Sequence, residues 1–379
     1  MTPDRLRDHF PVLGRTAYLA NCSLGARSAE LAASQADMLA AMNGVGNPWP
    51  AFEEQVTQVR NAVGGLLGTG PDDVSLQPCA SVAAYQVASG FSWSRGRRRI
   101  LTTRREFPSI AQVWLAQQRG GAEVVFVDDG DTSSGGVPDE EQYTRLLDER
   151  VALVSVPLAT YREAALLPVA TIAAAAHAAD AYQALGTMPL TVGRLGCGYL
   201  AGGTMKYLLG LPGLAFVYAR PGLRADRPPQ LTGWSGQRDP FAFDPRRLDF
   251  ADGGTRYETG TPSVPAVYAA NAGLGLIARL DLHAVRDHIS RLTRYAADQL
   301  SEAGERVLAP PQCGAHVAFF DQDPAGLAAG WPSAASWPAP RRRRATGRPF
   351  LHHFPRRRPR LHRDLLVPGR QYSNGACLA

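Results

Sequence analysis

Short apolar runs alternate with longer amphipathic stretches through most of the chain. The apolar runs are rich in Val, Ile and Leu, which is typical of strands buried on both faces of a sheet. We expect strands at 74–76, 99–103, 122–127, 151–156, 199–202 and 214–218. We expect helices at 28–42, 56–67, from 82 onward, and at 109–119, 140–149, 169–179 and 282–303. Strands that alternate with helices predict an α/β fold, a mostly parallel sheet covered by helices on both faces.

This pattern ends at about residue 325. From there Trp, Pro and Arg crowd together, and neither the strand period nor the helix period fits. The amphipathic helix at 282–303 is typical of a bridge into a second domain. We therefore predict a large domain at 1–280 with an N-terminal arm at 1–50, a bridging helix and the start of a small domain at 281–324, and a poorly folded Arg- and Pro-rich tail at 325–379.

Charge is divided unevenly between the tail and the rest of the chain. Residues 341–370 contain eleven arginines and one aspartate and so contribute +10, whereas all other residues together carry −4 of the formal total of +6. A basic segment can bind a polyanion. Because the body of the protein is mildly acidic, we do not expect nucleic acid to be its partner.

Composition also argues against a membrane protein and a disulfide-rich secreted protein. No run of about 18 apolar residues is present, so we expect no membrane span. The N-terminus, Met1-Thr2-Pro3-Asp4-Arg5, lacks the apolar core of a signal peptide. The five cysteines are scattered, without the paired spacing of a zinc site or a disulfide framework. These observations favour a cytoplasmic protein with reduced thiols.

The chain has one lysine, Lys206, beside thirty-nine arginines. This imbalance indicates a GC-rich genome, in which arginine replaces lysine wherever any positive charge is sufficient. A lysine that persists is a candidate for amine chemistry, because an amine can deprotonate and attack an aldehyde whereas a guanidinium cannot. A chance remainder is the alternative.

A second candidate site follows the strand at 74–76. Residues 78–81 connect this strand to the next helix, and such a turn presents free backbone N–H groups at a helix N-terminus. These groups bind phosphate readily. Ligands of parallel sheets lie at the carboxyl ends of the strands.

The segment around Lys206 carries a family signature together with an upstream motif. The lysine ends the stretch Gly202-Gly203-Thr204-Met205-Lys206, and Asp180-Ala181-Tyr182-Gln183 begins 26 residues before it. Further matching segments are Tyr18-Leu19-Ala20-Asn21-Cys22-Ser23-Leu24-Gly25, Glu106-Phe107-Pro108-Ser109 and Gly260-Thr261-Pro262. Over roughly residues 10–320 the chain resembles the class V aminotransferase family of fold type I enzymes that use pyridoxal 5′-phosphate (PLP). Within it, the chain is most similar to kynureninases and isopenicillin-N-epimerase-like proteins.

The resemblance implies a mostly parallel sheet of seven-stranded type, a small C-terminal domain and PLP as the cofactor. It implies that Lys206 forms a Schiff base with PLP and moves a proton, that Asp180 pairs with the ring nitrogen, and that Gln183 contacts the ring oxygen. Phe107 would stack on the ring. The phosphate ligands implied are Ala80, Ser81, Thr204 and, from a second copy of the chain, Thr261. The protein would therefore be a homodimer with composite active sites.

The reaction that we infer from this resemblance is cleavage of a Cβ–S or Cβ–C bond of an amino acid. A cysteine conjugate or a kynurenine-like compound would be the substrate, and a role in secondary metabolism, such as antibiotic biosynthesis, is a further hypothesis. Transamination, epimerisation and cysteine desulfuration stay open, because the outcome depends on which bond is aligned with the ring. A catalytically decayed PLP fold is the non-enzymatic alternative, and the intact lysine loop argues against it.

Two features depart from the family pattern. The family has a buried strand directly before its aspartate, whereas here the helix expected at 169–179 runs straight into Asp180. Asp180 would then lie away from a strand end unless that helix unwinds. The tail resembles a GC-rich gene read in a shifted frame, so we expect the small domain to be disrupted. No arginine for the substrate carboxylate is assigned.

Overall fold

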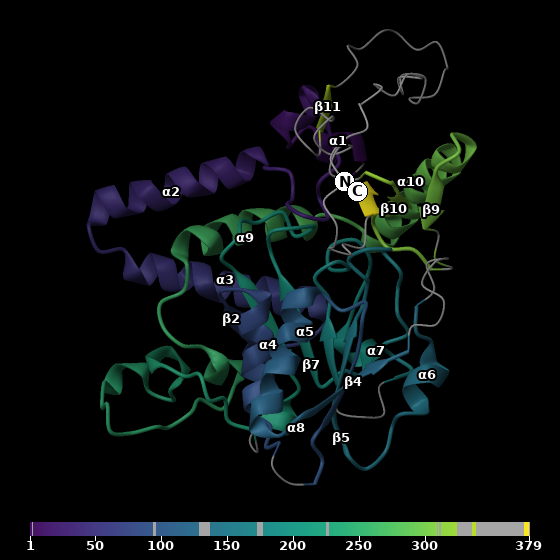
Figure 1. The fold of residues 1–379 in the computed structure, drawn as a ribbon. Helices are drawn as coiled ribbons and strands as arrows, with labels where there is room; N and C mark the ends of the chain where they lie inside the picture. Colours follow the sequence, from purple (N-terminus) through teal and green to yellow (C-terminus); the bar gives the residue numbers. More distant parts are fainter. Residues whose placement is uncertain are drawn as a thin grey trace, which may run out of the picture.

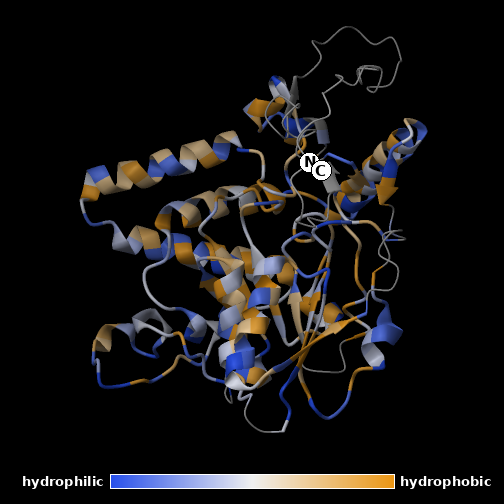
Figure 2. Cartoon of the chain, in the orientation of Figure 1, coloured by the Kyte–Doolittle hydropathy of each residue, from blue (hydrophilic) through white to orange (hydrophobic). Residues whose placement is uncertain are grey.

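The computed structural model describes residues 1, 3–93, 96–128, 137–172, 177–224, 227–308, 310, 312–323, 336–338 and 375–378. Figure 1 shows a central sheet with helices packed against it and a smaller group of strands beside helix α10. In Figure 2 the strands of the central sheet are largely orange, whereas the outer helices mix orange and blue, so the apolar core surrounds the sheet. None of the helices in these described ranges has the length and hydropathy needed to span a membrane.

The central sheet has seven strands in the order β2-β8-β7-β6-β5-β3-β4. Their bounds are β2 Val74–Gln77, β3 Arg99–Thr103, β4 Glu123–Val127, β5 Val151–Pro157, β6 His177–Asp180, β7 Tyr199–Gly203 and β8 Ala215–Ala219. Of these seven, β8 is the strand that runs antiparallel to its neighbours, β2 and β7, while β7, β6, β5, β3 and β4 are parallel. The prediction of a mostly parallel α/β sheet is confirmed.

Two apolar clusters cover the two faces of this sheet. Helices α3 (Trp49–Leu67) and α9 (Val264–Ile277) belong to one cluster. Helices α4 (Ala80–Ser89) and α5 (Pro108–Ala116) belong to the other. Neighbouring residues of β3 divide between the two clusters, as the alternation of side chains along a strand requires. The other helices are α1 Pro3–Arg7, α2 Ala29–Val45, α7 Val192–Leu195, α8 Pro221–Arg224 and α10 Leu282–Glu302.

One expected helix, at 140–149, is much shorter than predicted. Helix α6 spans Glu140–Thr144 and begins with a capping box in which Asp139 and Gln142 bond to each other's backbone. The chain then turns, and Leu146 and Leu147 pack against the core of the sheet. Burial of these two leucines outweighs the helix propensity of the polar residues that follow.

The expected helix at 169–179 is wrong where the structure describes it. Residues 169–172 form turns, residues 173–176 lie outside the described part, and His177–Asp180 form strand β6. This strand lies between β5 and β7, with Asp180 opposite Pro157 and Ala201. Ala178 and Ala179 are buried on opposite faces of the sheet. Filling the gap between two strands satisfies the backbone hydrogen bonds of all three, which outweighs the helix propensity of alanine. Asp180 therefore does lie at a strand end.

A smaller sheet lies beside α10. Its three strands are β9 Arg306–Leu308, β10 Val317–Phe320 and β12 Gly375–Leu378, in the order β12-β10-β9. A separate pair joins β1 Thr16–Tyr18 to β11 Ser336–Pro338. Two short segments of 325–379 form the strands β11 and β12, and the rest of that segment lies outside the described residues, so the expectation of a poorly folded tail stays a prediction. The division into domains stays a prediction.

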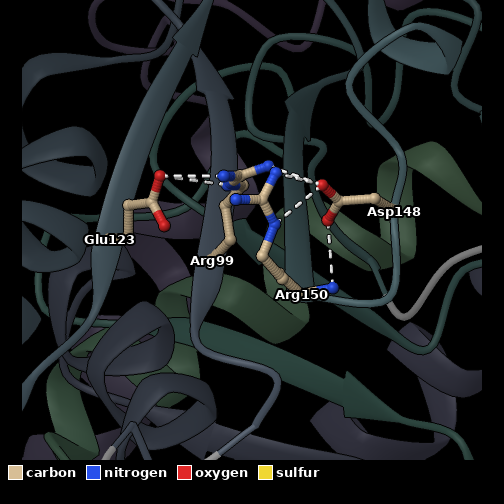
Figure 3. Close-up of polar contacts among 4 residues, drawn as sticks. All are labelled: Arg99, Glu123, Asp148 and Arg150. Atoms are coloured by element: carbon tan, nitrogen blue, oxygen red, sulfur yellow. Dashed lines mark hydrogen bonds and ion pairs between the residues drawn. The ribbon is translucent and has the colours of Figure 1, made fainter.

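Charged side chains of opposite sign pair at the amino-terminal edge of the central sheet (Figure 3). Arg99, at the start of β3, bonds to Glu123 at the start of β4 and to Asp148, both at 2.9 Å. Asp148 also accepts hydrogen bonds from the backbone and guanidinium of Arg150. The charged side chains described here at this edge of the sheet are thus paired with each other.

Candidate active site

A cavity of about 260 Å³ lies at the opposite, carboxyl-terminal edge of the sheet. The segments that follow β2, β3, β5, β6 and β7 contribute to its walls, as expected for a ligand site of a parallel sheet. Of the residues predicted from the sequence, the following line the cavity: Ala80, Ser81, Phe107, Asp180, Gln183 and Lys206.

Lys206 lies in a tight loop between β7 and β8. The backbone of this loop closes on itself, because the Gly210 N–H donates to the Thr204 carbonyl (2.8 Å) and the Leu209 N–H donates to the Lys206 carbonyl (3.0 Å). Leu209 has a positive φ of 62°, which is rare for a residue other than glycine and shows that the surrounding bonds determine the loop's course. The position of Lys206 is therefore fixed by the backbone.

Two aromatic rings flank the amine of Lys206. Its Nζ lies 4.8 Å from the ring centroid of Tyr182 and 5.5 Å from that of Phe107. Tyr161 packs edge-on against Phe107 and also lines the cavity. An amine held against aromatic rings in a mostly buried site, where Lys206 is 9% exposed, is shielded from bulk water. This environment suits a lysine that must act as a nucleophile.

Asp180 ends β6 and points into the same cavity. One of its carboxylate oxygens accepts a hydrogen bond from the Tyr182 N–H at 2.9 Å. Burial raises the pKa of Asp180, while the Tyr182 N–H and the charge of Lys206 act in the opposite direction. Because the Asp180 carboxylate is desolvated, its charged form would be stabilised by a cation bound in the cavity.

Gln183 connects the cavity to the N-terminal arm. Its side-chain amide donates to the Cys22 carbonyl at 3.2 Å, and among the described residues its Oε1 has no hydrogen-bond partner. Nearby, the Gly25 N–H donates to the Met205 carbonyl (2.7 Å). A Cβ at Gly25 would lie 2.3 Å from the Lys206 carbonyl oxygen, so glycine is needed for this approach. The Asn21–Gly25 motif thus fastens the arm to the lysine loop.

The predicted phosphate ligands lie in three different environments. Ala80 and Ser81 begin α4, whose N-cap residue, Cys79, offers no side-chain bond, so the first N–H groups of the helix face the cavity uncapped. Thr261 lines a neighbouring cavity of about 90 Å³ that shares Pro78 with the first. Whether Thr261 serves a second copy of the chain stays a prediction.

Thr204 does not line either cavity, contrary to its predicted role in phosphate binding. It is fully buried, and its hydroxyl donates to the Leu214 carbonyl at 3.1 Å. The side chain therefore closes the base of the lysine loop instead of facing the ligand. The position of Thr204 two residues before the lysine does not indicate where its side chain points, because the direction of a loop side chain depends on the fold around it.

Sequence reasoning missed two residues of the site. Tyr182 lies within the Asp180 motif, and its ring packs so closely over Gly203 that a Cβ there would lie 2.1 Å from it. Glu106, next to Phe107, is buried at 2% exposure. No local pattern indicates the first. The second directly precedes Phe107, the predicted stacking residue, and this position could have indicated it.

Comparison with known proteins identifies the class to which this site belongs. The profile of the family described as Aminotransferase class-V matches residues 29–323, and the chain belongs to this family. The chain is 31% identical over 313 residues to the uncharacterized aminotransferase YcbU of Bacillus subtilis, covering 81% of each chain. It is 27% identical over 349 residues to the kynureninase of Pseudomonas fluorescens, covering 85% of this chain and 81% of the relative.

A solved structure confirms the fold. The apo structure of a cysteine desulfurase from Thermococcus onnurineus NA1 superposes with a TM-score of 0.78 at 20% identity, over 87% of this chain and 85% of that chain. The fold is that of fold type I PLP enzymes, and the protein is a PLP-dependent enzyme of the lyase or transferase type.

The groups in the cavity fit this cofactor. Lys206 supplies the amine, Asp180 supplies a carboxylate for the ring nitrogen, Phe107 supplies a flat ring, and the N-terminus of α4 supplies donors for a phosphate. When bound, PLP accepts the electrons that a substrate releases as a bond at its α-carbon breaks.

Proposed function

We propose that the protein is a PLP-dependent lyase that cleaves a Cβ–S or Cβ–C bond of an amino acid. Two proton movements are needed at neighbouring carbons. A base removes the proton at Cα; a proton donor then acts either on the sulfur that leaves from Cβ or, when water adds to the neighbouring carbonyl and the Cβ–C bond breaks, on Cβ itself. Lys206 Nζ is the base. The observation that carries the proposal is a phenol, Tyr182, that lies beside this amine in the same cavity.

Tyr182 has the properties of the required acid. Burial, followed by the charges of Asp180 and Cys79, raises the pKa of its hydroxyl to about 12. The phenol therefore keeps its proton at neutral pH. It can donate that proton to the strongly basic Cβ left when a Cβ–C bond breaks, and it can donate a hydrogen bond to a leaving sulfur, which is less basic than the phenolate. Similarity to a kynureninase over most of the chain also supports a lyase.

A second candidate, cysteine desulfuration, is favoured by the position of Cys22. Burial raises the pKa of its thiol, while the charge of Lys206 lowers it, so this sulfur lies within electrostatic range of the lysine. In that reaction the C–S bond of cysteine breaks, the sulfur joins the sulfur of Cys22 as a persulfide, and alanine leaves. One relative of the chain is a probable cysteine desulfurase of Chlamydia trachomatis.

We propose further that the protein acts as a homodimer in the cytoplasm. An aromatic cluster of Trp234, Phe241 and Phe243 is exposed by 42% to 70%, and such a patch is typical of a surface that another protein covers. A second copy would complete the active site with Thr261 of the partner subunit. A role in antibiotic biosynthesis is proposed from the family resemblance alone.

The products of a substrate panel test the lyase proposal. The PLP-loaded protein is incubated with S-aryl cysteine conjugates, L-kynurenine and L-cysteine, with Lys206→Arg as the inactive control. We expect pyruvate and free thiol from the conjugates, or alanine from kynurenine, and a strong loss of either with Tyr182→Phe. Amino transfer to a 2-oxo acid with both Cβ bonds intact would contradict the proposal. Alanine from L-cysteine, with a persulfide that Cys22→Ser abolishes, would favour desulfuration.

A further inference from the structure

A second buried carboxyl group, Glu106, lies within electrostatic range of Asp180. Glu106 is 2% exposed and belongs to the turn between β3 and α5. Its Oε1 accepts the Phe107 N–H at 2.9 Å, and its Oε2 lies 2.9 Å from the hydroxyl of Ser155 in β5. Asp180 ends β6, and β5, which carries Ser155, lies between β6 and the strand that precedes Glu106, so the charge of Asp180 acts on Glu106 across β5.

We propose that Glu106 is a positioning residue that keeps its proton, so that the carboxyl pair carries one negative charge and that charge stays on Asp180, where the ring nitrogen of PLP binds. The proposal rests on the assignment of the cofactor and not on which substrate bond is broken.

The surroundings of the two acids assign the proton to Glu106. Asp180 accepts a backbone N–H and is near the cation of Lys206, and both favour its charged form. Within the described part of the chain, no cation is among the groups that shift the pKa of Glu106, and the neighbouring Arg105 pairs with Glu163. A serine hydroxyl can accept as well as donate, so the Ser155 contact is compatible with a protonated Glu106.

The electrostatic balance points the same way. Burial and then the charge of Asp180 raise the pKa of Glu106 to about 8, against the opposing hydrogen bonds from Ser155 and the Phe107 N–H. Two buried carboxyls within electrostatic range of each other cannot both ionise readily, and they titrate as a pair. At neutral pH the pair therefore holds one proton.

This arrangement predicts a specific dependence of stability on pH. Because the pKa of Glu106 is higher in the folded protein (about 8) than its ordinary value of 4.5, the folded state binds the proton more tightly. The stabilisation is complete below the ordinary value and is lost as the pH rises to the folded value. Glutamine imitates the protonated acid and cannot titrate, so Glu106→Gln should remove this loss.

The test compares unfolding of the PLP-free protein with and without the titrating group. Urea midpoints are measured from pH 5 to pH 9 for the wild type, Glu106→Gln and an exposed control, Glu53→Gln. We expect the midpoint of Glu106→Gln, relative to wild type, to rise steadily up to about pH 8 and then level off, while the control stays parallel to wild type. A constant difference across this range would overturn the proposal.

Two further variants separate a positioning role from simple packing. In an Asp180→Asn background the like charge is absent, so the rise should shift to lower pH; an unchanged profile would show that the acids are not coupled. In the PLP-loaded protein, Glu106→Ala should weaken cofactor binding and shift the pH profile of its visible absorbance. Glu106→Gln should restore both near neutral pH. Failure of glutamine to rescue would also overturn the proposal, whatever reaction the enzyme catalyses.

Discussion

The two edges of the parallel sheet differ in how their charged side chains are arranged. At the amino-terminal edge, Arg99 is held between Glu123 and Asp148, so each of these two acids has a cation beside it. At the carboxyl-terminal edge, Asp180 and Glu106 lie together in the interior, and Lys206 is the cation near Asp180. The first arrangement satisfies its own charges. The second places two acids within electrostatic range of each other in the interior, where ionising both would cost folding energy.

This difference separates a structural edge from a functional one. Paired surface charges contribute little to stability and are replaceable. Buried groups with displaced pKa values cluster where a ligand will compensate them. The carboxyl-terminal edge is therefore organised for a ligand that brings a positive ring nitrogen and a negative phosphate. Substitutions at the two edges should consequently differ in kind: one set affects chemistry, and the other affects only salt-dependent stability.

Replacement of Lys206 should have the largest effect. Lys206→Arg keeps a positive charge but cannot attach covalently to PLP. We expect borohydride to fix the cofactor to the Lys206 peptide in wild type and to no peptide in the variant. Turnover should fall by roughly 1,000-fold or more, because a general base alone contributes on the order of 10²–10⁴-fold.

The control for this variant is the stability of the PLP-free protein. Lys206→Arg should retain the unfolding midpoint of the PLP-free wild type within a small margin. Recovery of a borohydride-modified peptide elsewhere in the chain, with turnover intact, would show that another group holds the cofactor.

Asp180→Asn should have the second-largest effect. Asparagine keeps an acceptor for the Tyr182 N–H but cannot hold the ring nitrogen protonated. We expect turnover to fall by roughly 100-fold or more, in the range seen for removal of one preorganised electrostatic group. Since burial raises the pKa of Asp180, the variant should be at least as stable as wild type at neutral pH. A stability loss with normal kcat would assign Asp180 to the structural edge instead.

The order of strands and helices could be predicted from the sequence, because most strands are continuous apolar runs. Strand β3 has the predicted bounds, and β5 and β7 differ from them by one residue. Strand β6 could not be predicted, since His177–Asp180 is short and its alanines favour a helix in isolation. It exists because two neighbouring strands leave a place for it.

The structure brings together some of the predicted site residues and not others, and the topology of the sheet explains the difference. Residues at strand ends, such as Asp180 and Phe107, line the cavity because the topology brings all carboxyl ends together. Thr204 does not, because its side chain points back to the Leu214 carbonyl. The electrostatic interaction between Glu106 and Asp180 joins positions far apart in the chain, and no local sequence pattern indicates such an interaction.

The smallest effect should come from the amino-terminal edge. Asp148→Asn removes the carboxylate that accepts from Arg99 and Arg150 at 2.9 Å each, but an amide oxygen remains to accept one of these bonds. These hydrogen bonds lower the pKa of Asp148, so its contribution is present at neutral pH and is lost only as the pH falls below its ordinary value of 3.8. We expect a slight decrease in melting temperature at pH 7 and low salt that becomes smaller in about 1 M salt, where the Debye length is about 3 Å. Cofactor binding and turnover should be unchanged, because the site lies at the other ends of the strands. A salt-independent decrease, or a change in PLP affinity, would show that the two edges are coupled through the sheet and that the separation drawn here is wrong.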